Sequence, residues 1–291
     1  MTDTSWLGPP IDVRPVLAEQ QAAFIDLLRH LDTDEWAQPT ICPGWSVKDV
    51  AAHVLGDHIG RLSIHRDGFH VLHPQDGEAF PTFLDRINDE WVNAARRISP
   101  PMLIELLSAI GTQIVEFWQT VDLNALGGPV RWAGPGPHPY WLDVAREYTE
   151  YWTHQQQICD ATGRSGLTDP RYLSPVIDTF MRGLPHTLRD ATAQQGASLQ
   201  VNVTGPGGGD WTCTRGPDHW RLHHQPHSQP TAQLELDADT TWRLCTRGIT
   251  PEQAAEHART DGDQHLATAA LQIVSIIWSP SDPRHSESFD I

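Results

Sequence analysis

The chain has 291 residues, of which 37 are acidic and 20 are basic, giving a net charge of −17. A field of this sign repels polyanions, so we exclude nucleic acid and anionic membrane surfaces as partners. The length predicts one large or two modest domains. No stretch approaches 18 consecutive apolar residues, and the amino terminus lacks the basic and apolar regions of a secretory signal. The four cysteines form no CxxC pair, so we expect free thiols in a reducing cytoplasm.

Helical periodicity dominates the first two thirds of the chain. Apolar residues at helical spacing predict helices over residues 11–31, 47–66, 80–98, 102–121, 142–162 and 172–193. Ser46 and Asp49 have the spacing of a capping box, which predicts where the second helix begins. Residues 127–141 are too rich in glycine and proline to form regular structure.

The apolar periodicity changes from helical to alternating after residue 195. Alternating segments predict strands over residues 198–205, 210–215, 219–224 and 231–237. Short helices are expected over residues 240–247, 251–257 and 263–277. The sequence therefore predicts an α+β protein, with an all-helical domain over residues 1–195 and a small α/β domain over residues 196–291.

The strongest local pattern is the pair formed by Glu150 and His154. Because they are four residues apart on a predicted helix, their side chains lie on one face, one turn apart. A carboxylate and a neutral imidazole both suit zinc, which commonly keeps three protein ligands in catalytic sites. The two side chains point away from the apolar stripe of their helix. They either face water or line a groove that another element covers.

His53 is the candidate third ligand. It lies beside the apolar stripe of the helix predicted over residues 47–66, and on this helix alone it could equally be a structural core histidine. Asp57 follows one turn later on the same side, where it could orient the imidazole as a hydrogen-bonding partner behind the metal.

Residues 42–58, CPGWSVKDVAAHVLGDH, resemble the helix-entry motif of DinB-like metalloenzymes, in the branch of the mycothiol-dependent maleylpyruvate isomerases. The resemblance assigns the metal ligands of that branch to His53, Glu150 and His154. It implies a DinB-like four-helix bundle followed by a sterol-carrier-like α/β domain. The polar run HQQQICDATG departs from the His-Gly/Arg-Trp-Asp run common in the family, which leaves the substrate open. The excess of arginine over lysine agrees with the actinobacteria, in which the branch is large.

The resemblance also implies a chemistry. A divalent metal, zinc before others, would activate mycothiol or a similar low-molecular-weight thiol, and the thiolate would attack a small electrophilic substrate. The outcome would be cis–trans isomerisation or S-transfer, by a cytoplasmic monomer or homodimer. An acidic or enone substrate needs cationic help. We select Arg243 and Arg86 as candidate catalytic residues, with a surface salt bridge as the other interpretation of each.

Two other functions remain open on the residues alone. The same three ligands could activate water in a metal-dependent hydrolase, or the chain could be a non-catalytic small-molecule binding or resistance protein. The histidine-rich segment 219–227 could hold a second metal, but the absence of cysteine or carboxylate spacing favours an exposed strand and loop.

Overall fold

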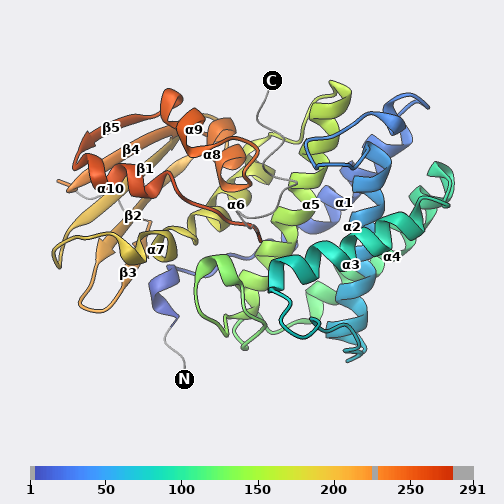
Figure 1. Ribbon diagram of the computed structural model, residues 1–291, viewed down its shortest axis with the longest axis horizontal. Helices are drawn as coiled ribbons and strands as arrows, with labels where there is room; N and C mark the ends of the chain where they lie inside the picture. Colours follow the sequence, from blue (N-terminus) through green and yellow to red (C-terminus); the bar gives the residue numbers. More distant parts are fainter. Residues whose placement is uncertain (1–3, 225–228, 278–291) are drawn as a thin grey trace. The chain divides into compact units, whose positions relative to one another are not determined.

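The computed structural model describes residues 4–224 and 229–277, which form two compact units (Figure 1). The helical unit comprises residues 14–121 and 150–167, and the sheet unit comprises the remaining described residues. His227, at the end of the histidine-rich segment, lies outside the described residues.

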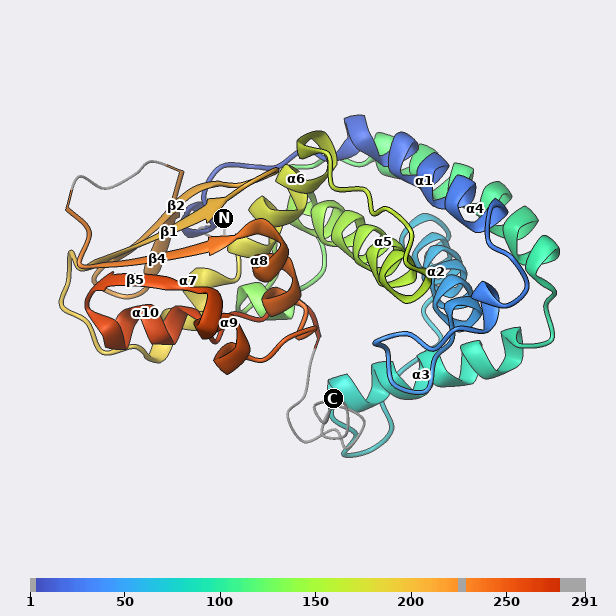
Figure 2. The same ribbon diagram turned by 90° about the horizontal axis from the view of Figure 1, so that it is seen from above.

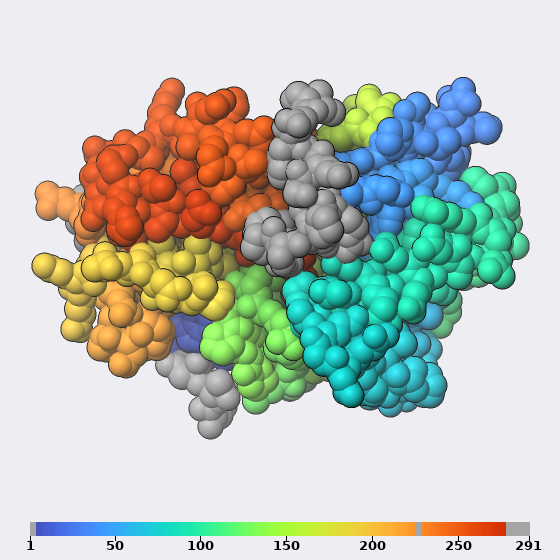
Figure 3. Space-filling model, in the orientation of Figure 1, coloured from blue at the N-terminus to red at the C-terminus, as the bar shows by residue number. Residues whose placement is uncertain are grey.

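The helical unit contains four complete helices and the later part of a fifth. These are α1 (Arg14–Arg29), α2 (Val47–Arg61), α3 (Phe80–Ala95), α4 (Pro100–Thr120) and α5 (Tyr140–Thr162). A 3-10 turn, Glu35–Ala37, precedes α2, and a π turn, Leu62–Arg66, follows it. α2 contacts both α3 and α4, and α1 contacts α4 (Figure 2). α3 lies at the surface of this unit (Figure 3).

The core of the helical unit places α2 against α5. Buried apolar side chains of α2, among them Val54 and Leu55, pack in one cluster with Tyr151 and Ile158 of α5. Full burial of such a side chain contributes about 1.5–3 kcal/mol, so this cluster fixes how the two helices face each other. That packing decides which polar side chains of α2 and α5 can meet.

The sheet unit is built on a five-stranded sheet of order β3-β2-β1-β4-β5. The strands are β1 (Ser198–Thr204), β2 (Gly209–Arg215), β3 (Trp220–His223), β4 (Ala232–Asp237) and β5 (Arg259–Gly262). β1 pairs in parallel with β4, and the other neighbours are antiparallel. Val201 lies opposite Leu234 in this register, and both are buried, whereas the intervening residues of β1 and β4 are polar. This alternation gives the sheet one apolar and one polar face.

Five further helices belong to the sheet unit, in addition to the first part of α5. They are α6 (Pro170–Met181), α7 (Leu184–Thr187), α8 (Ala238–Cys245), α9 (Pro251–His257) and α10 (Gln264–Ala270). α8 contacts β1 and β4, and α10 contacts β4 and β5. None of the helices in the described part of the chain is long and apolar enough to cross a membrane.

The fold class, α+β with a helical N-terminal part and a C-terminal sheet, is confirmed. The helix predicted over 172–193 is wrong in length, because it breaks at Gly183 into α6 and α7; Pro185 has no N–H to continue the ladder. The helix predicted over 263–277 ends early: the N–H of Ser275 donates instead to the carbonyl of Cys245, at 2.8 Å. β5 was not predicted, because its four residues are exposed and lack strand alternation.

The division of the chain at residue 195 stays a prediction about domains. The two compact units do not divide the chain at residue 195, since residues 122–149 and α6 group with the sheet. A helix-rich sequence does not say which helices pack on each other and which pack on a sheet.

Candidate metal centre

The Cys-Pro-Gly-Trp corner fixes the start of α2. The N–H of Trp45 donates to the carbonyl of Cys42 at 3.0 Å, and Gly44 turns the chain with a φ of 75°. Ser46 then forms the predicted capping box with Asp49: each side chain accepts a hydrogen bond from the other residue's backbone N–H. Burial opposes ionisation of Asp49, but Arg96 and Ser46 outweigh it and lower its pKa. The first turn of α2 is therefore held in place.

His53 projects from the second turn of α2 and is 7% exposed. Its Nε2 lies 3.1 Å from Oε1 of Glu150 on α5. The indole of Trp45 lies beside the imidazole of His53, with the two ring centroids 5.0 Å apart. His53 is thus directed toward α5 by a buried helix start and an aromatic neighbour.

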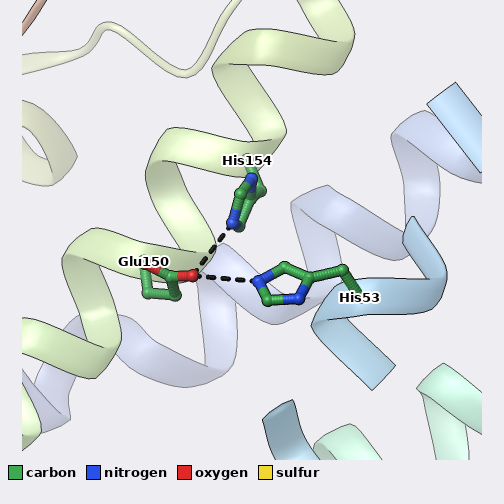
Figure 4. A group of neighbouring side chains, drawn as sticks. All are labelled: His53, Glu150 and His154. Atoms are coloured by element: carbon green, nitrogen blue, oxygen red, sulfur yellow. Dashed lines mark hydrogen bonds and ion pairs between the residues drawn. The ribbon is translucent and has the colours of Figure 1, made fainter. Parts of the chain in front are cut away.

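Glu150 and His154 meet His53 from one face of α5 (Figure 4). The same carboxylate oxygen of Glu150, Oε1, lies 2.9 Å from Nε2 of His154. One ligand atom from each of the three residues lies within 4.8 Å of the other two. The i, i+4 pair on α5 and the single histidine on α2 are therefore brought together.

The charges within the triad (His53, Glu150 and His154) support one another. Burial would raise the pKa of Glu150, but the His154 and His53 imidazoles hold it well below its ordinary value. Burial would lower the pKa of His154, but the Glu150 carboxylate holds it well above its ordinary value. A carboxylate therefore stays ionised between the two rings.

The donor set of the triad fits a divalent metal. Two imidazole nitrogens and one carboxylate oxygen are the ligands found in three-ligand catalytic zinc sites, which leave a further position for water or substrate. The Glu150 side chain is 36% exposed, so the triad is accessible from one side. In residues 4–224 and 229–277, no other group of three such side chains has its ligand atoms this close together. His219, His223 and His224 therefore do not form a second site of this kind.

Behind His154 lie Gln157 and Cys42, which were not among the predicted site residues. Oε1 of Gln157 lies 2.7 Å from Nδ1 of His154 and 3.2 Å from Sγ of Cys42. The spacing of three residues between His154 and Gln157 places them on one face of α5 and could have revealed that contact. The contact with Cys42 depends on how α5 packs near the corner before α2, which no local pattern predicts.

Asp57 lies one turn after His53 on α2, as expected. Its Oδ1 is 3.4 Å from Nε of Arg61, so the carboxylate pairs with the next turn of its own helix. Its role in orienting His53 stays a prediction.

The two candidate catalytic arginines lie on different units. Arg86 of α3 makes a two-bond contact with Glu78, at 2.8 and 2.9 Å, and its guanidinium lies over the ring of Phe83. That contact lowers the pKa of Glu78 to about 2. Arg243 of α8, in the sheet unit, bonds Asp239 at 2.9 Å and lies over the ring of Trp242. Both therefore make the local contacts of structural arginines, and their catalytic roles stay predictions.

The sequence of residues 17–159 matches the family described as the mycothiol maleylpyruvate isomerase N-terminal domain. The match spans 17–159 and shows that this part of the chain is similar to that family's domain. All three residues of the triad, together with Cys42 and Gln157, lie within the matched isomerase-family domain.

The fold has relatives among solved structures. A mycothiol-dependent maleylpyruvate isomerase and a point mutant of it each superpose with a TM-score of 0.53 and 14% identity, covering 89% of this chain and 96% of theirs. At this identity the likeness concerns the fold alone. A ubiquinone synthesis protein, described as UbiJ-SCP2, covers 33% of this chain with 17% identity and a TM-score of 0.24. No curated protein matches the chain by sequence.

Proposed function

We propose that this chain is a divalent-metal-dependent enzyme that uses a low-molecular-weight thiol of the mycothiol type on a small electrophile, first as a cis–trans isomerase and otherwise as an S-transferase. The observation that carries the proposal is the convergence of His53, Glu150 and His154 within 4.8 Å, inside the domain that matches the isomerase family. Zinc is the metal we expect, because its preferred ligands are those present.

Each residue of the triad has a part in this proposal. His53 and His154 would each present an imidazole nitrogen from a different helix, and Glu150 would supply the negative charge. A bound divalent cation would lower the pKa of a coordinated thiol, so that a thiolate exists at neutral pH. The accessible side of Glu150 is where the thiol and the substrate would enter.

The reaction we propose is a reversible addition. The thiolate sulfur bonds to one carbon of an electron-poor double bond, and the π electrons move to the conjugated carbonyl. Rotation about the resulting single bond follows. The electrons return, the sulfur leaves as thiolate, and the trans isomer remains. If the enolate instead takes up a proton from water at carbon, the thioether adduct is released and the overall reaction is S-transfer.

The partners in this proposal are a thiol and a small-molecule substrate, with the chain as monomer or homodimer in the cytoplasm. The four free cysteines agree with a reducing compartment.

The metal is tested by elemental analysis of the purified protein. We expect about one zinc per chain, lost in His53→Ala and Glu150→Ala. His30→Ala is the matched control, because His30 lies in the same unit but is exposed and pairs with Asp26. Equal metal content in all four proteins would refute the metal site.

The thiol is tested on the cobalt-substituted protein. Titration with mycothiol should change the visible spectrum, because a thiolate ligand adds a charge-transfer band. Maleylpyruvate with mycothiol is the first substrate to try, followed by NMR for the trans isomer. A spectrum insensitive to thiol, together with hydrolysis of ester or amide probes, would favour a metal-dependent hydrolase. Insensitivity without turnover would favour a binding protein.

A further inference from the structure

Gln157 holds the side of His154 that faces away from Glu150. The His154 ring lies between two oxygens, with Nε2 at 2.9 Å from Glu150 Oε1 and Nδ1 at 2.7 Å from Gln157 Oε1. His154 is 9% exposed, so water has little access to either nitrogen. A proton on Nδ1 therefore has an acceptor in Gln157, and Nε2 is directed toward Glu150.

The direction of this hydrogen bond decides which nitrogen can bind a metal. A side-chain carbonyl oxygen accepts hydrogen bonds and cannot donate, so Nδ1 must carry the proton. In the neutral ring the lone pair then lies on Nε2, the nitrogen nearest Glu150 and His53. Ligand histidines commonly have their other ring nitrogen bonded in this way, which fixes both the tautomer and the plane of the ring.

Cys42 explains why the oxygen of Gln157, and not its amino group, faces His154. The thiol of Cys42 donates to the same Oε1 at 3.2 Å. Two donors thus converge on one carbonyl oxygen. Turning the amide over would place its N–H groups against both donors, which costs free energy at a partly buried position.

The other two glutamines of the run behave differently. The side chain of Gln155 accepts a hydrogen bond from Gln20 of α1 at 3.1 Å, and both residues are buried. Gln156 is likewise buried, at 4% exposed. Gln157 contacts His154 of the triad, whereas Gln155 contacts α1 and offers a matched control on the same helix.

We infer that Gln157 is a positioning residue of the metal centre: its carbonyl oxygen, oriented by Cys42, holds the Nδ1 proton of His154 and presents Nε2 to the metal. This inference rests on the metal site of the proposed function. It gives the polar run after Glu150 a role in the site that is independent of the substrate.

The test compares Gln157→Leu, Gln157→Glu and Gln155→Leu with the unchanged protein, using Co²⁺ alone as the probe. Loss of an outer hydrogen-bonding partner typically weakens metal binding about 10–100-fold, and we expect this for Gln157→Leu. Gln157→Glu keeps an acceptor and should restore the affinity to within a few-fold of the original. Gln155→Leu, which removes a contact with α1, should bind Co²⁺ as the unchanged protein does.

A second readout follows the ring itself without metal. In ¹H–¹⁵N spectra of the metal-free protein, the Nδ1–H of His154 should be protected from exchange in the unchanged protein and in Gln157→Glu. It should be lost in Gln157→Leu. Far-UV circular dichroism verifies that all variants are folded.

The outcomes separate the two claims. If the unchanged protein binds Co²⁺ and Gln157→Leu binds it equally well, the positioning role is wrong and the metal site stands. If Gln157→Leu is weak and Gln157→Glu is no better, the defect is one of packing and the inference is also overturned. If the unchanged protein binds no Co²⁺, the proposed function itself fails.

Discussion

Trp45 and His53 are in ring contact, with centroids 5.0 Å apart and planes tilted by 43°. Trp45 ends the corner that starts α2, and His53 lies on the second turn of the same helix. The Cys-Pro-Gly-Trp corner therefore has two structural roles. It sets the first residue of the helix, and it covers one face of a candidate ligand.

We expect Trp45→Ala to weaken Co²⁺ binding without abolishing it. The one hydrogen-bonding group of the indole, its Nε1–H, donates to Oδ1 of Asp89 at 3.3 Å. The contact with His53 is therefore ring packing, and its loss should weaken binding by less than the roughly 10–100-fold expected for an outer hydrogen-bonding partner. Trp45→Phe keeps an aromatic ring beside His53, so its Co²⁺ affinity should lie between those of Trp45→Ala and the unchanged protein. Isothermal titration would measure all three; an unchanged affinity in Trp45→Ala would show that the contact is incidental.

Two glycines of α2 give opposite predictions for the same substitution. A Cβ at Gly56 would lie 2.4–2.9 Å from atoms of the Trp91 indole, whose Nε1 donates to the carbonyl of Ala52 at 2.7 Å. Gly56→Ala must displace that ring, and overpacking of about 1–3 kcal/mol should exceed the gain in helix propensity of about 1 kcal/mol. We expect net destabilisation.

Gly60 is the matched control, because a Cβ there meets no atom within 4 Å. Gly60→Ala should stabilise the protein by up to about 1 kcal/mol through helix propensity. Urea unfolding measures both free energies. Equal effects of the two substitutions would mean that Trp91 does not pack on α2 as described.

Asp178 of α6 should make the stability of the protein depend on pH in the acid range. Its carboxylate accepts hydrogen bonds from Trp211 and Arg182, both at 2.8 Å, and lies 3.1 Å from His224. Burial would raise the pKa of Asp178, but His224, Arg182 and Trp211 outweigh it and lower the pKa. Since the folded pKa is the lower one, the unfolded chain binds the proton first as the pH falls. The stabilisation is complete above the unfolded pKa, about 3.9, and is lost as the pH falls through the folded value.

Asp178→Ala should therefore destabilise the protein at neutral pH and flatten the acid side of its stability profile. Arg182 is fully buried, and leaving its charge without the carboxylate should cost about 3–5 kcal/mol. Thermal unfolding between pH 3 and pH 7 measures both effects. A variant that keeps the original acid dependence would show that other carboxylates control it.

Local signals in the sequence predicted some elements well. The predicted bounds of α9, Pro251–His257, are those of the structure, where proline occupies the first turn and Thr250 forms a capping box with Gln253. The first residue of α2 followed from Ser46 and Asp49 in the same way. Such signals act within one turn, so they need no knowledge of the fold.

The candidate site was predictable only in part. Glu150 and His154 lie on one face because of helix geometry, whereas their meeting with His53 depends on α2 packing against α5. The link from His154 through Gln157 to Cys42 depends on the same packing. β5 and the break before α7 were missed because tertiary contacts and a proline override the local pattern.

The central claim is that His53, Glu150 and His154 together hold one divalent cation. Anomalous diffraction at the zinc edge, from crystals grown with zinc, tests it most directly. We predict one strong peak at about 2.0–2.2 Å from Nε2 of His53, Nε2 of His154 and a carboxylate oxygen of Glu150. A crystal with zinc at other sites and none between these three side chains would contradict the claim.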